Sequence, residues 1–327
     1  MPDYVLGEYL LNGASVEIDE ARFDALLKNS EIIRVIWDVE EAFSLLAKAF
    51  IEFEEYLLVA GLGYYYKRDM QRDVDNFFDD VRQTINLKLI SFLTASRAYE
   101  DHLHRRMSCL SKLSSKKIDL KGNFNSVFDK SLEYRVMYAL RNHALHRQLP
   151  LGTVALSGSN LSETGSMLDD PPSRMRTTVD PKISVAEFCA SDKIRLATRD
   201  EVEGLGYKHL DLKYFVRGFL SCLANCHDEF RTVTQNILEG ALGQLRNAQD
   251  DLADKKGEGP KLVSIFKRDA GQIIENHYVD FERKSRLLDL RKYWTGLKSV
   301  QKGYISSEIT SSKDTYPQAD DKIWITK

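Results

Sequence analysis

The chain has 327 residues, of which 43% are hydrophobic and 29% charged, and its formal net charge is −3. This composition is that of an ordinary soluble protein of one or two domains with a substantial core, and it argues against bulk disorder. The first residues lack a basic segment followed by an apolar run, and no stretch approaches the roughly 20 apolar residues that span a bilayer. We therefore expect a cytoplasmic protein with no membrane segment.

Apolar residues that recur at steps of three or four predict a series of amphipathic helices. The predicted helices cover residues 19 or 20 to 27, 31–59, 69–110, 124–147 and 211–238. The glycines at positions 61 and 63 are expected to end the second of these. Short connections between long helices favour antiparallel neighbours. The expected fold is therefore mainly α, an antiparallel helical bundle.

The composition changes between residues 152 and 199. Ser, Gly, Asp and Pro gather in 157–166 and 169–173, and short apolar runs at 153–156 and 183–185 could form strands. We interpret 152–199 as a small loop and β insertion in a helical bundle domain that covers residues 1–240. Residues 257–260 then interrupt a polar segment, and 241–327 are expected to form a C-terminal helical extension and tail.

The most informative stretch lies at the end of the predicted helix 124–147. It contains Arg141, Asn142 and His146, and Pro150 closes it. An arginine offers a forked, permanently charged donor for phosphate oxygens, and a histidine that titrates near neutral pH can act as general base or acid. The set can therefore clamp a phosphate and move a proton, which are the two functions that a metal-free ribonuclease needs.

These residues resemble the R-x4-6-H motif of the HEPN superfamily, small helical domains many of which are RNA-cleaving toxins and defence effectors. The upstream segment 91–102 also looks like the helix that packs beside the motif helix in bacterial HEPN proteins, so the resemblance covers roughly residues 31–150. It implies a metal-independent endoribonuclease without a cofactor. Arg141 would hold the phosphate, His146 would transfer the proton and Asn142 would orient one of the reacting groups.

One motif supplies one histidine, whereas in-line cleavage needs an acid and a base on opposite sides of the phosphorus. HEPN proteins solve this by dimerising so that two motifs face one cleft, and the resemblance implies a homodimer here. A regulatory antitoxin or partner protein is also expected from the toxin members of the superfamily.

Local charge adds to this interpretation. Between Arg97 and Arg147 there are eleven Lys or Arg and five Asp or Glu, although the whole chain is slightly acidic. The candidate RNA-binding residues are Arg97, Arg105, Arg106, Lys116, Lys117 and Arg147. A solvated helix face would explain the same charges.

Two other stretches have both a functional and a structural interpretation. The aromatic and basic residues of 64–68 could stack bases and hold phosphates, or they could pack at a helix junction. HEPN proteins can place an acidic residue near the motif, and the first long helix offers several candidates. These are Glu40, Glu41, Glu52, Glu54 and Glu55.

Metal binding is not expected. The four cysteines are too few and too scattered for a disulfide framework, and only Cys222 and Cys226, beside His227, are close enough to share a helical face. There is no matching second pair, so buried and reduced thiols are the better interpretation. The histidine pairs 102/104 and 143/146 are similarly weak, since residues two apart on a helix point in different directions.

Two further classes remain open. One is a non-catalytic HEPN-like scaffold that binds RNA or protein, in which Arg141 and His146 only stabilise the motif turn. The other is an interaction protein whose C-terminal helices bind a partner. The sequence contains no glycine-rich phosphate loop, nucleophile elbow or zinc-hydrolase motif, so nucleotide hydrolysis and acyl transfer rank below both.

Overall fold

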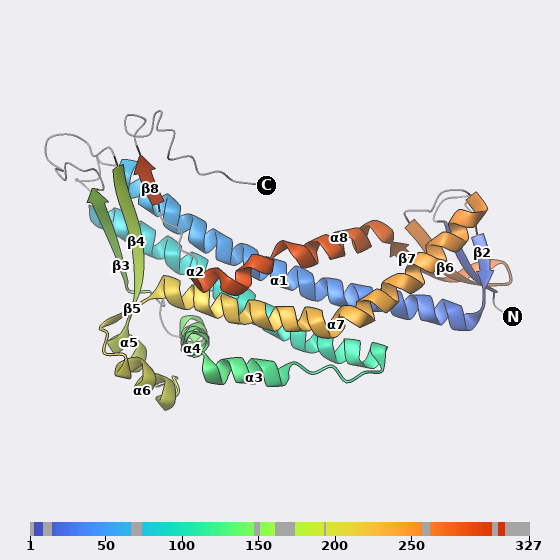
Figure 1. Cartoon of the computed structure of the whole chain (residues 1–327), viewed down its shortest axis with the longest axis horizontal. Helices are drawn as coiled ribbons and strands as arrows, with labels where there is room; N and C mark the ends of the chain where they lie inside the picture. The colour runs from blue at the N-terminus through green and yellow to red at the C-terminus, as the bar shows by residue number, and fades with distance from the viewer. Residues whose placement is uncertain are drawn as a thin grey trace. The chain divides into compact units, whose positions relative to one another are not determined.

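The computed structural model describes residues 3–8, 15–66, 74–146, 151–160, 174–192, 194–256, 262–302 and 307–310. Within them the chain is mainly α-helical, with two small antiparallel sheets (Figure 1). The helices are α1 (Glu20–Tyr66), α2 (Val74–Ser114), α3 (Lys121–Lys130), α4 (Leu132–His146), α5 (Val185–Cys189), α6 (Leu196–Gly204), α7 (Leu212–Lys256), α8 (Phe281–Tyr293) and the 3-10 helix η2 (Thr295–Lys302). The strands are β1 (Asp3–Glu8), β2 (Ser15–Ile18), β3 (Thr153–Asn160), β4 (Arg174–Ser184), β5 (His209–Asp211), β6 (Leu262–Asp269), β7 (Gln272–Asp280) and β8 (Ser307–Thr310). Among the described helices, none combines the length and the apolarity that a bilayer crossing requires.

The chain divides into two compact units, each assembled from three stretches of sequence. Unit 1 comprises Met1–Ala47, Ala95–Val127 and Cys222–Lys298, and unit 2 comprises Lys48–Thr94, Phe128–Ser221 and Ser299–Lys327. The helices α1, α2 and α7 contribute a segment to each unit. The boundary expected between residues 240 and 241 falls inside α7.

The first long helix differs from the prediction. A short helix to residue 27 and a second one over 31–59 were expected, but α1 is one continuous helix of 47 residues. It also continues past the glycines that were expected to end it. A β-carbon at Gly63 would lie 3.8 Å from the Phe77 ring, an ordinary van der Waals distance, so α2 passes close beside this turn of α1 in unit 2. Tertiary contacts here outweigh the roughly 1 kcal/mol by which glycine weakens a helix.

The predicted helix 124–147 is two helices, α3 and α4, separated at Ser131. The Ser131 hydroxyl accepts a hydrogen bond from the Tyr134 amide at 3.1 Å and donates one to the Glu133 carboxylate at 2.8 Å. This is the arrangement of an N-cap, which satisfies amides that have no partner at a helix start. The motif therefore lies in a short helix with its own beginning.

The helices predicted over 69–110 and 211–238 are present as α2 and α7, and α7 extends to Lys256. Their apolar stripes form the cores of the two units. In unit 2, the rings of Phe92 and Phe219 lie 6.0 Å apart edge to face, and Phe50 and Tyr134 extend this group. All four side chains are buried.

The first sheet belongs to unit 1 and has the strand order β2-β1-β6-β7. All its neighbours are antiparallel, and β1 joins the N-terminus to the C-terminal hairpin, with Val5 opposite Phe266. Ala270 and Gly271 connect β6 to β7 with positive φ angles of 48° and 83°, as a two-residue hairpin turn requires. The strands at both ends of the chain were not predicted, and the region from residue 241 is therefore not the purely helical extension that was expected.

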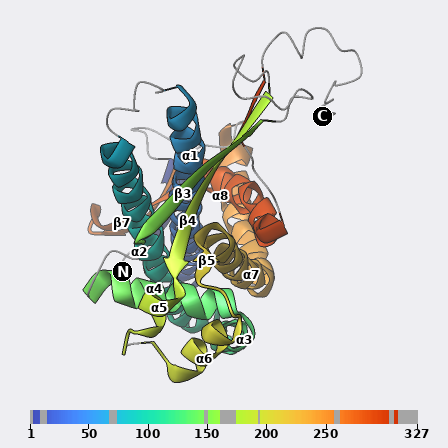
Figure 2. The ribbon, with the colours of Figure 1, turned by 90° about the vertical axis from the view of Figure 1, so that its left-hand side faces the viewer.

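The second sheet belongs to unit 2; β3 and β4 lie within the predicted insertion, whereas β5 and β8 lie outside it. The long pair β3 and β4 is prominent in Figure 2. Strands were expected at 153–156 and 183–185; β3 covers the first and extends beyond it, whereas β4 ends at Ser184 and Val185 already begins α5. The helices α5 and α6 were not predicted. Ser184 caps α5, since its hydroxyl accepts a hydrogen bond from the Glu187 amide.

Candidate functional site

The motif helix α4 is anchored in unit 2 by one apolar face. Tyr134, Val136, Met137 and Leu140 are buried at spacings of one to three residues. Tyr134 contacts the Phe219 ring of α7 with centroids 4.9 Å apart. This packing fixes the rotation of α4 about its axis. It therefore also fixes the directions in which the motif residues of the next turn point.

Arg141 lies on this packed side of α4. The residue is 2% exposed, and its guanidinium carbon lies 4.4 Å from the centroid of the Tyr138 ring. Such stacking on an aromatic face restrains the orientation of the guanidinium plane. Asn142 follows and is half-buried. The motif arginine is thus held in one orientation inside unit 2 rather than extended into solvent.

The last part of the motif is described only by its backbone. His146 is the final residue of α4, but its side chain, that of His143 and the whole of Arg147 lie outside the described residues. Five helical residues correspond to about 140° of rotation and about 7.5 Å of rise. The backbone of α4 alone therefore does not bring positions 141 and 146 onto one face.

An aromatic group supports the stacked tyrosine. The Phe128 ring, at the end of α3, meets the Tyr138 ring edge to face at 5.8 Å and the Tyr134 ring at 6.0 Å. The Arg195 guanidinium lies 4.9 Å from the centroid of the same phenylalanine ring. A change at this phenylalanine would consequently loosen the ring on which Arg141 rests.

The chain after the motif is held by a residue that sequence reasoning missed. Asn86, on α2, donates a hydrogen bond to the Leu151 carbonyl and accepts one from the Leu151 amide, each at 3.0 Å. Both residues are 1% exposed. A buried asparagine that satisfies both backbone groups of one residue fixes the point where the motif loop rejoins the fold. Its only signal in the sequence is an amide side chain inside an apolar helical stripe.

The predicted RNA-binding arginines of α2 belong to unit 1, whereas the motif belongs to unit 2. Arg97 forms an ion pair with Asp101 at 2.9 Å, and the Arg105 side chain donates to the Asp101 carbonyl at 3.2 Å. Arg106 forms an ion pair with Asp38 at 2.7 Å. Two of these three arginines have a carboxylate counterion at hydrogen-bond distance, which lowers the positive potential that they offer to RNA.

The two predicted RNA-binding lysines lie in the connection between α2 and α3. Lys116 and Lys117 are both exposed. The connection begins at Ser115, whose φ of 54° is uncommon for a residue other than glycine. These lysines offer charges that a phosphate backbone could reach.

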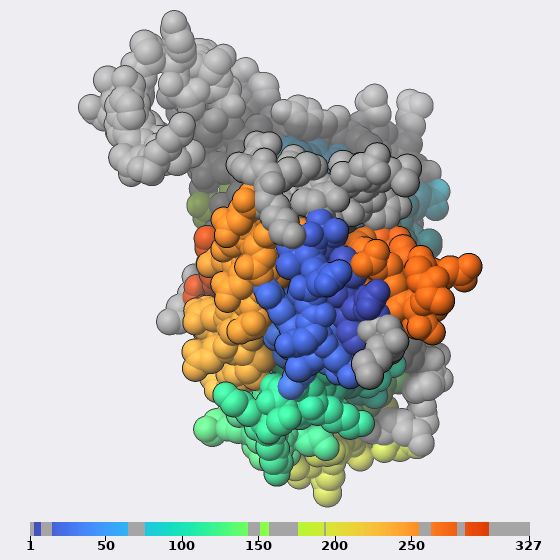
Figure 3. Space-filling view, turned by 90° about the vertical axis from the view of Figure 1, so that its right-hand side faces the viewer, coloured from blue at the N-terminus to red at the C-terminus, as the bar shows by residue number. Residues whose placement is uncertain are grey.

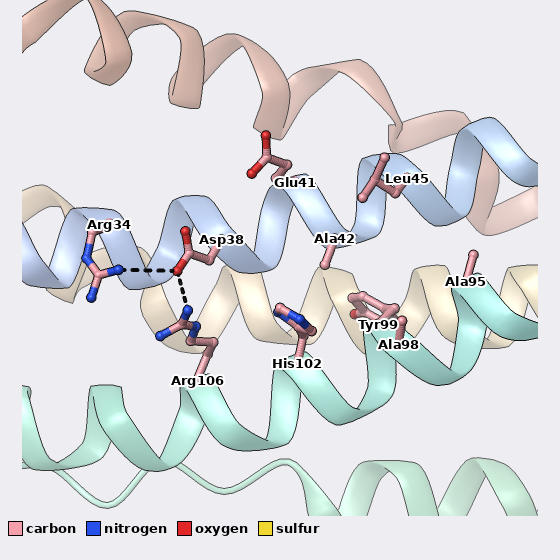
Figure 4. A pocket seen from close by; sticks show the side chains of 10 residues that line it. All are labelled: Arg34, Asp38, Glu41, Ala42, Leu45, Ala95, Ala98, Tyr99, His102 and Arg106. Carbon is pink, nitrogen blue, oxygen red and sulfur yellow. Dashed lines mark ion pairs between the residues drawn. The ribbon is translucent and has the colours of Figure 1, made fainter.

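A groove between α1 and α2 in unit 1 includes Arg106 (Figure 4). Its volume is about 420 Å³, and its charged end holds Asp38 between Arg106 and Arg34, which lies 4.0 Å away. Small side chains form its middle. The lining residues are Arg34, Asp38, Glu41, Ala42, Leu45, Ala95, Ala98, Tyr99, His102 and Arg106.

Tyr99, which lines this groove, also belongs to a buried polar cluster of unit 1 that sequence reasoning missed. Glu40 is fully buried and its carboxylate lies 2.9 Å from Nε2 of His227, which is 1% exposed. The hydroxyl of buried Tyr99 lies 3.0 Å from the other ring nitrogen, Nδ1. The His227 ring also stacks on Phe43, with centroids 3.9 Å apart. Three helices, α1, α2 and α7, thereby meet at one imidazole.

Two arginines complete this cluster. Arg231 donates to both oxygens of Glu40 at distances of 2.7 to 3.2 Å, and the Nε of Arg291, on α8, lies 3.8 Å from the same carboxylate. Arg291 also donates to the Arg231 carbonyl at 2.8 Å. The single buried carboxylate therefore faces two guanidinium groups and ties α8 to α7.

These contacts determine which groups are charged. Burial alone would raise the pKa of Glu40, but the hydrogen bond from His227 and the hydrogen bonds and charge of Arg231 lower it to about 2. Burial lowers the pKa of His227 more than Glu40 raises it. At neutral pH the ring is therefore neutral, with Nε2 donating to the carboxylate and Nδ1 accepting from the Tyr99 hydroxyl.

The five glutamates of α1 separate into two kinds. Glu41, Glu52 and Glu55 are exposed, whereas Glu40 and Glu54 are buried. Glu54 belongs to unit 2, as the motif does, and its two oxygens accept hydrogen bonds from Arg217 at 2.7 Å each. Each buried glutamate is thus paired with an arginine of α7.

The candidate cysteines of α7 are poorly suited to bind a metal ion. Burial raises the pKa of Cys226 to about 12, which favours the thiol over the thiolate that a metal would bind. Over the described ranges, no three His, Cys, Asp or Glu side chains gather in a group that could hold a metal ion. Tyr64 is 39% exposed and lies 6.4 Å from the Phe77 ring, but the side chains at 65–68 lie outside the described residues.

Comparison with known proteins adds no relative: no family model, no curated protein and no solved structure matches this chain.

Proposed function

We propose that this chain is a metal-independent endoribonuclease of the HEPN type. The observation that carries the proposal is the motif of Arg141, Asn142 and His146 at the end of α4, in which the arginine is fixed against Tyr138. The hydrogen bonds of Asn86 to Leu151 add to it, because they hold the chain just beyond the motif. A charge stabiliser that is held in place needs little reorganisation during the reaction.

In the proposed reaction the ribose 2′-oxygen attacks the adjacent phosphorus while the bond from phosphorus to the 5′-oxygen breaks. His146 of one copy accepts the 2′-hydroxyl proton, and protonated His146 of the second copy donates a proton to the departing 5′-oxygen. Arg141 binds the non-bridging oxygens, and Asn142 orients one of these groups by hydrogen bonding. The products are a 2′,3′-cyclic phosphate and a 5′-hydroxyl.

This mechanism requires a homodimer, since α4 contributes one histidine per chain. The biological setting that we propose is a toxin or a defence or stress effector, with a regulatory antitoxin or partner protein.

A second candidate function is a non-catalytic scaffold that binds RNA or protein. The burial of Arg141 specifically favours it, since a guanidinium that is 2% exposed offers little surface to a phosphate. In that case its stacking on Tyr138 serves stability alone. Under the ribonuclease proposal, by contrast, the side chains around Arg141 must move to admit RNA.

Substitutions in the motif separate the two candidates. We expect Arg141→Ala and His146→Ala each to reduce RNA cleavage by roughly a hundredfold or more, and His146→Ala to leave the thermal stability nearly unchanged. His143→Ala, in the same helix, is the matched control and should retain most activity. Because Arg141 is buried, Arg141→Lys is a useful second variant, which keeps the charge but loses the fork. If the variants cleave like wild type, or if they simply unfold, the scaffold function is favoured.

A further inference from the structure

The strand β7 lies at the edge of the first sheet. Its register with β6 places Asn276 opposite Phe266 and Tyr278 opposite Ser264, and no described strand pairs with its other side. Figure 3 shows β6 and β7 as the orange surface beside the blue surface of β1 and the start of α1. An edge strand presents a row of backbone donors and acceptors that can pair with another strand.

The outer part of β7 carries large apolar side chains. Ile274 is 59% exposed and Tyr278 is 52% exposed. These two residues lie on either side of Asn276 along the strand, and the Asn276 amide donates to the Tyr278 hydroxyl at 2.8 Å. A β-bulge opposite Lys267 and Arg268 makes Ile274 an extra residue of β7 relative to β6. Proteins usually protect such edges with lysine or proline, and β7 contains neither. The exposed apolar residues therefore suggest that the edge is covered.

The sequence of β7 is complementary to itself when two copies run antiparallel. With Asn276 opposite Asn276 of a second copy, Ile274 lies opposite Tyr278, and Glu275 lies opposite His277. Each pair occurs twice because of the two-fold symmetry. Cross-strand pairs stabilise antiparallel sheets when an aromatic residue lies opposite a β-branched one, or when an acidic residue lies opposite a basic one.

Neighbouring registers lack this match. An axis at Glu275 would place Ile274 opposite Asn276, and an axis at His277 would place it opposite Asp280. Both arrangements set an apolar side chain against a polar or charged one. We therefore propose that β7 pairs with β7 of a second copy of this chain, antiparallel about a two-fold axis at Asn276, to form one continuous eight-stranded sheet.

This interface stands apart from the proposed ribonuclease activity, because it involves no residue of the motif. A single pair of nine-residue strands is small compared with the roughly 1,600 Å² of a standard protein interface. We therefore expect a dimer that dissociates on dilution, which sedimentation velocity over a range of concentrations can follow.

Cysteine cross-linking tests the register. Only a residue on the two-fold axis faces its own copy, and opposite Cα atoms in an antiparallel pair lie about 4.5 to 5.5 Å apart, within disulfide range. Oxidised Asn276→Cys should give a covalent dimer. Ile274→Cys alone should give little, but a mixture of Ile274→Cys and Tyr278→Cys proteins should cross-link. Wild type, with its four free cysteines, sets the background.

A charge on the edge tests the interface without a new thiol. Ile274→Lys should weaken dimerisation roughly tenfold or more, because both Ile274–Tyr278 pairs across the two-fold axis are lost. Its circular dichroism spectrum and melting temperature should match those of wild type, since the side chain is exposed in the single chain. A wild-type protein that is monomeric at all concentrations would overturn the proposal. So would a dimer that tolerates Ile274→Lys while Asn276→Cys fails to cross-link.

Discussion

Replacing Glu40 by glutamine tests the buried cluster of unit 1 most sharply. The substitution keeps the shape of the side chain but removes the negative charge that faces Arg231 and Arg291. Two buried guanidinium groups then lose the carboxylate that they share. Loss of one partner from a buried ion pair typically costs about 3–5 kcal/mol.

The pKa of Glu40 gives an independent magnitude. Its ordinary value is 4.5, and the folded protein lowers it to about 2. Each unit corresponds to about 1.4 kcal/mol, so the folded state favours the ionised carboxylate by about 3 kcal/mol. Both routes therefore predict that Glu40→Gln reduces the free energy of unfolding by about 3 kcal/mol or more at neutral pH.

The sign of the pH dependence follows from the same shift. Because the folded pKa is the lower one, the stabilisation by Glu40 is complete above pH 4.5 and disappears as the pH falls toward 2. His227 also has a lowered folded pKa, so the unfolded chain protonates first and stability declines as the pH drops below 6.5. Wild type should lose stability in both ranges on acidification, and the Glu40→Gln variant should lack the loss between 4.5 and 2.

Urea denaturation followed by circular dichroism at pH 7, 5 and 3 measures these differences. The matched control is Glu41→Gln, one residue away and exposed, which should stay within about 0.5 kcal/mol of wild type. Equal midpoints for wild type and Glu40→Gln at pH 7 would refute the reasoning. A difference that persists unchanged at pH 3 would show that the charge is not its cause.

Three further substitutions probe other buried contacts. Tyr99→Phe removes the donor to Nδ1 of His227 and should cost about 1–3 kcal/mol in urea denaturation; an unchanged midpoint would contradict this hydrogen bond. Arg217→Leu removes the partner of the buried Glu54 carboxylate and should reduce the free energy of unfolding by about 3–5 kcal/mol. Replacing both Arg217 and Glu54 by leucine should restore part of this loss. A double variant no more stable than the single one would argue against the pair. Asn86→Ala leaves the buried amide and carbonyl of Leu151 without their side-chain partner. We expect the free energy of unfolding to fall by at least about 2 kcal/mol and hydrogen exchange at the Leu151 amide to become faster. Continued protection of that amide would contradict the prediction.

The long helices could be predicted because each has a continuous apolar stripe. The break at Ser131 was missed because the apolar pattern continues across it, although a serine three residues before Tyr134 is a capping signal. The end expected at Gly63 was also wrong, because α1 continues through both glycines to Tyr66, where α2 passes close beside it. Local patterns thus locate helices but do not determine their ends.

The first sheet could not be predicted from local patterns. Val5 pairs with Phe266, a residue at the opposite end of the chain, and a short strand has no signal strong enough to reveal such a partner. The buried cluster was missed similarly. Glu40 was noted only as one acid of a charged helix, and its partners His227 and Arg231 lie on α7, where sequence alone does not show that they face it.

The chemistry of RNA cleavage tests the central claim most directly. End-labelled RNA is incubated in excess EDTA with wild type and with His146→Ala, and the ends of the products are identified. We predict that wild type gives 2′,3′-cyclic phosphate and 5′-hydroxyl ends and that His146→Ala gives neither above background. Chelator-sensitive cleavage with 5′-phosphate ends, or equal cleavage by both proteins, would contradict the proposal.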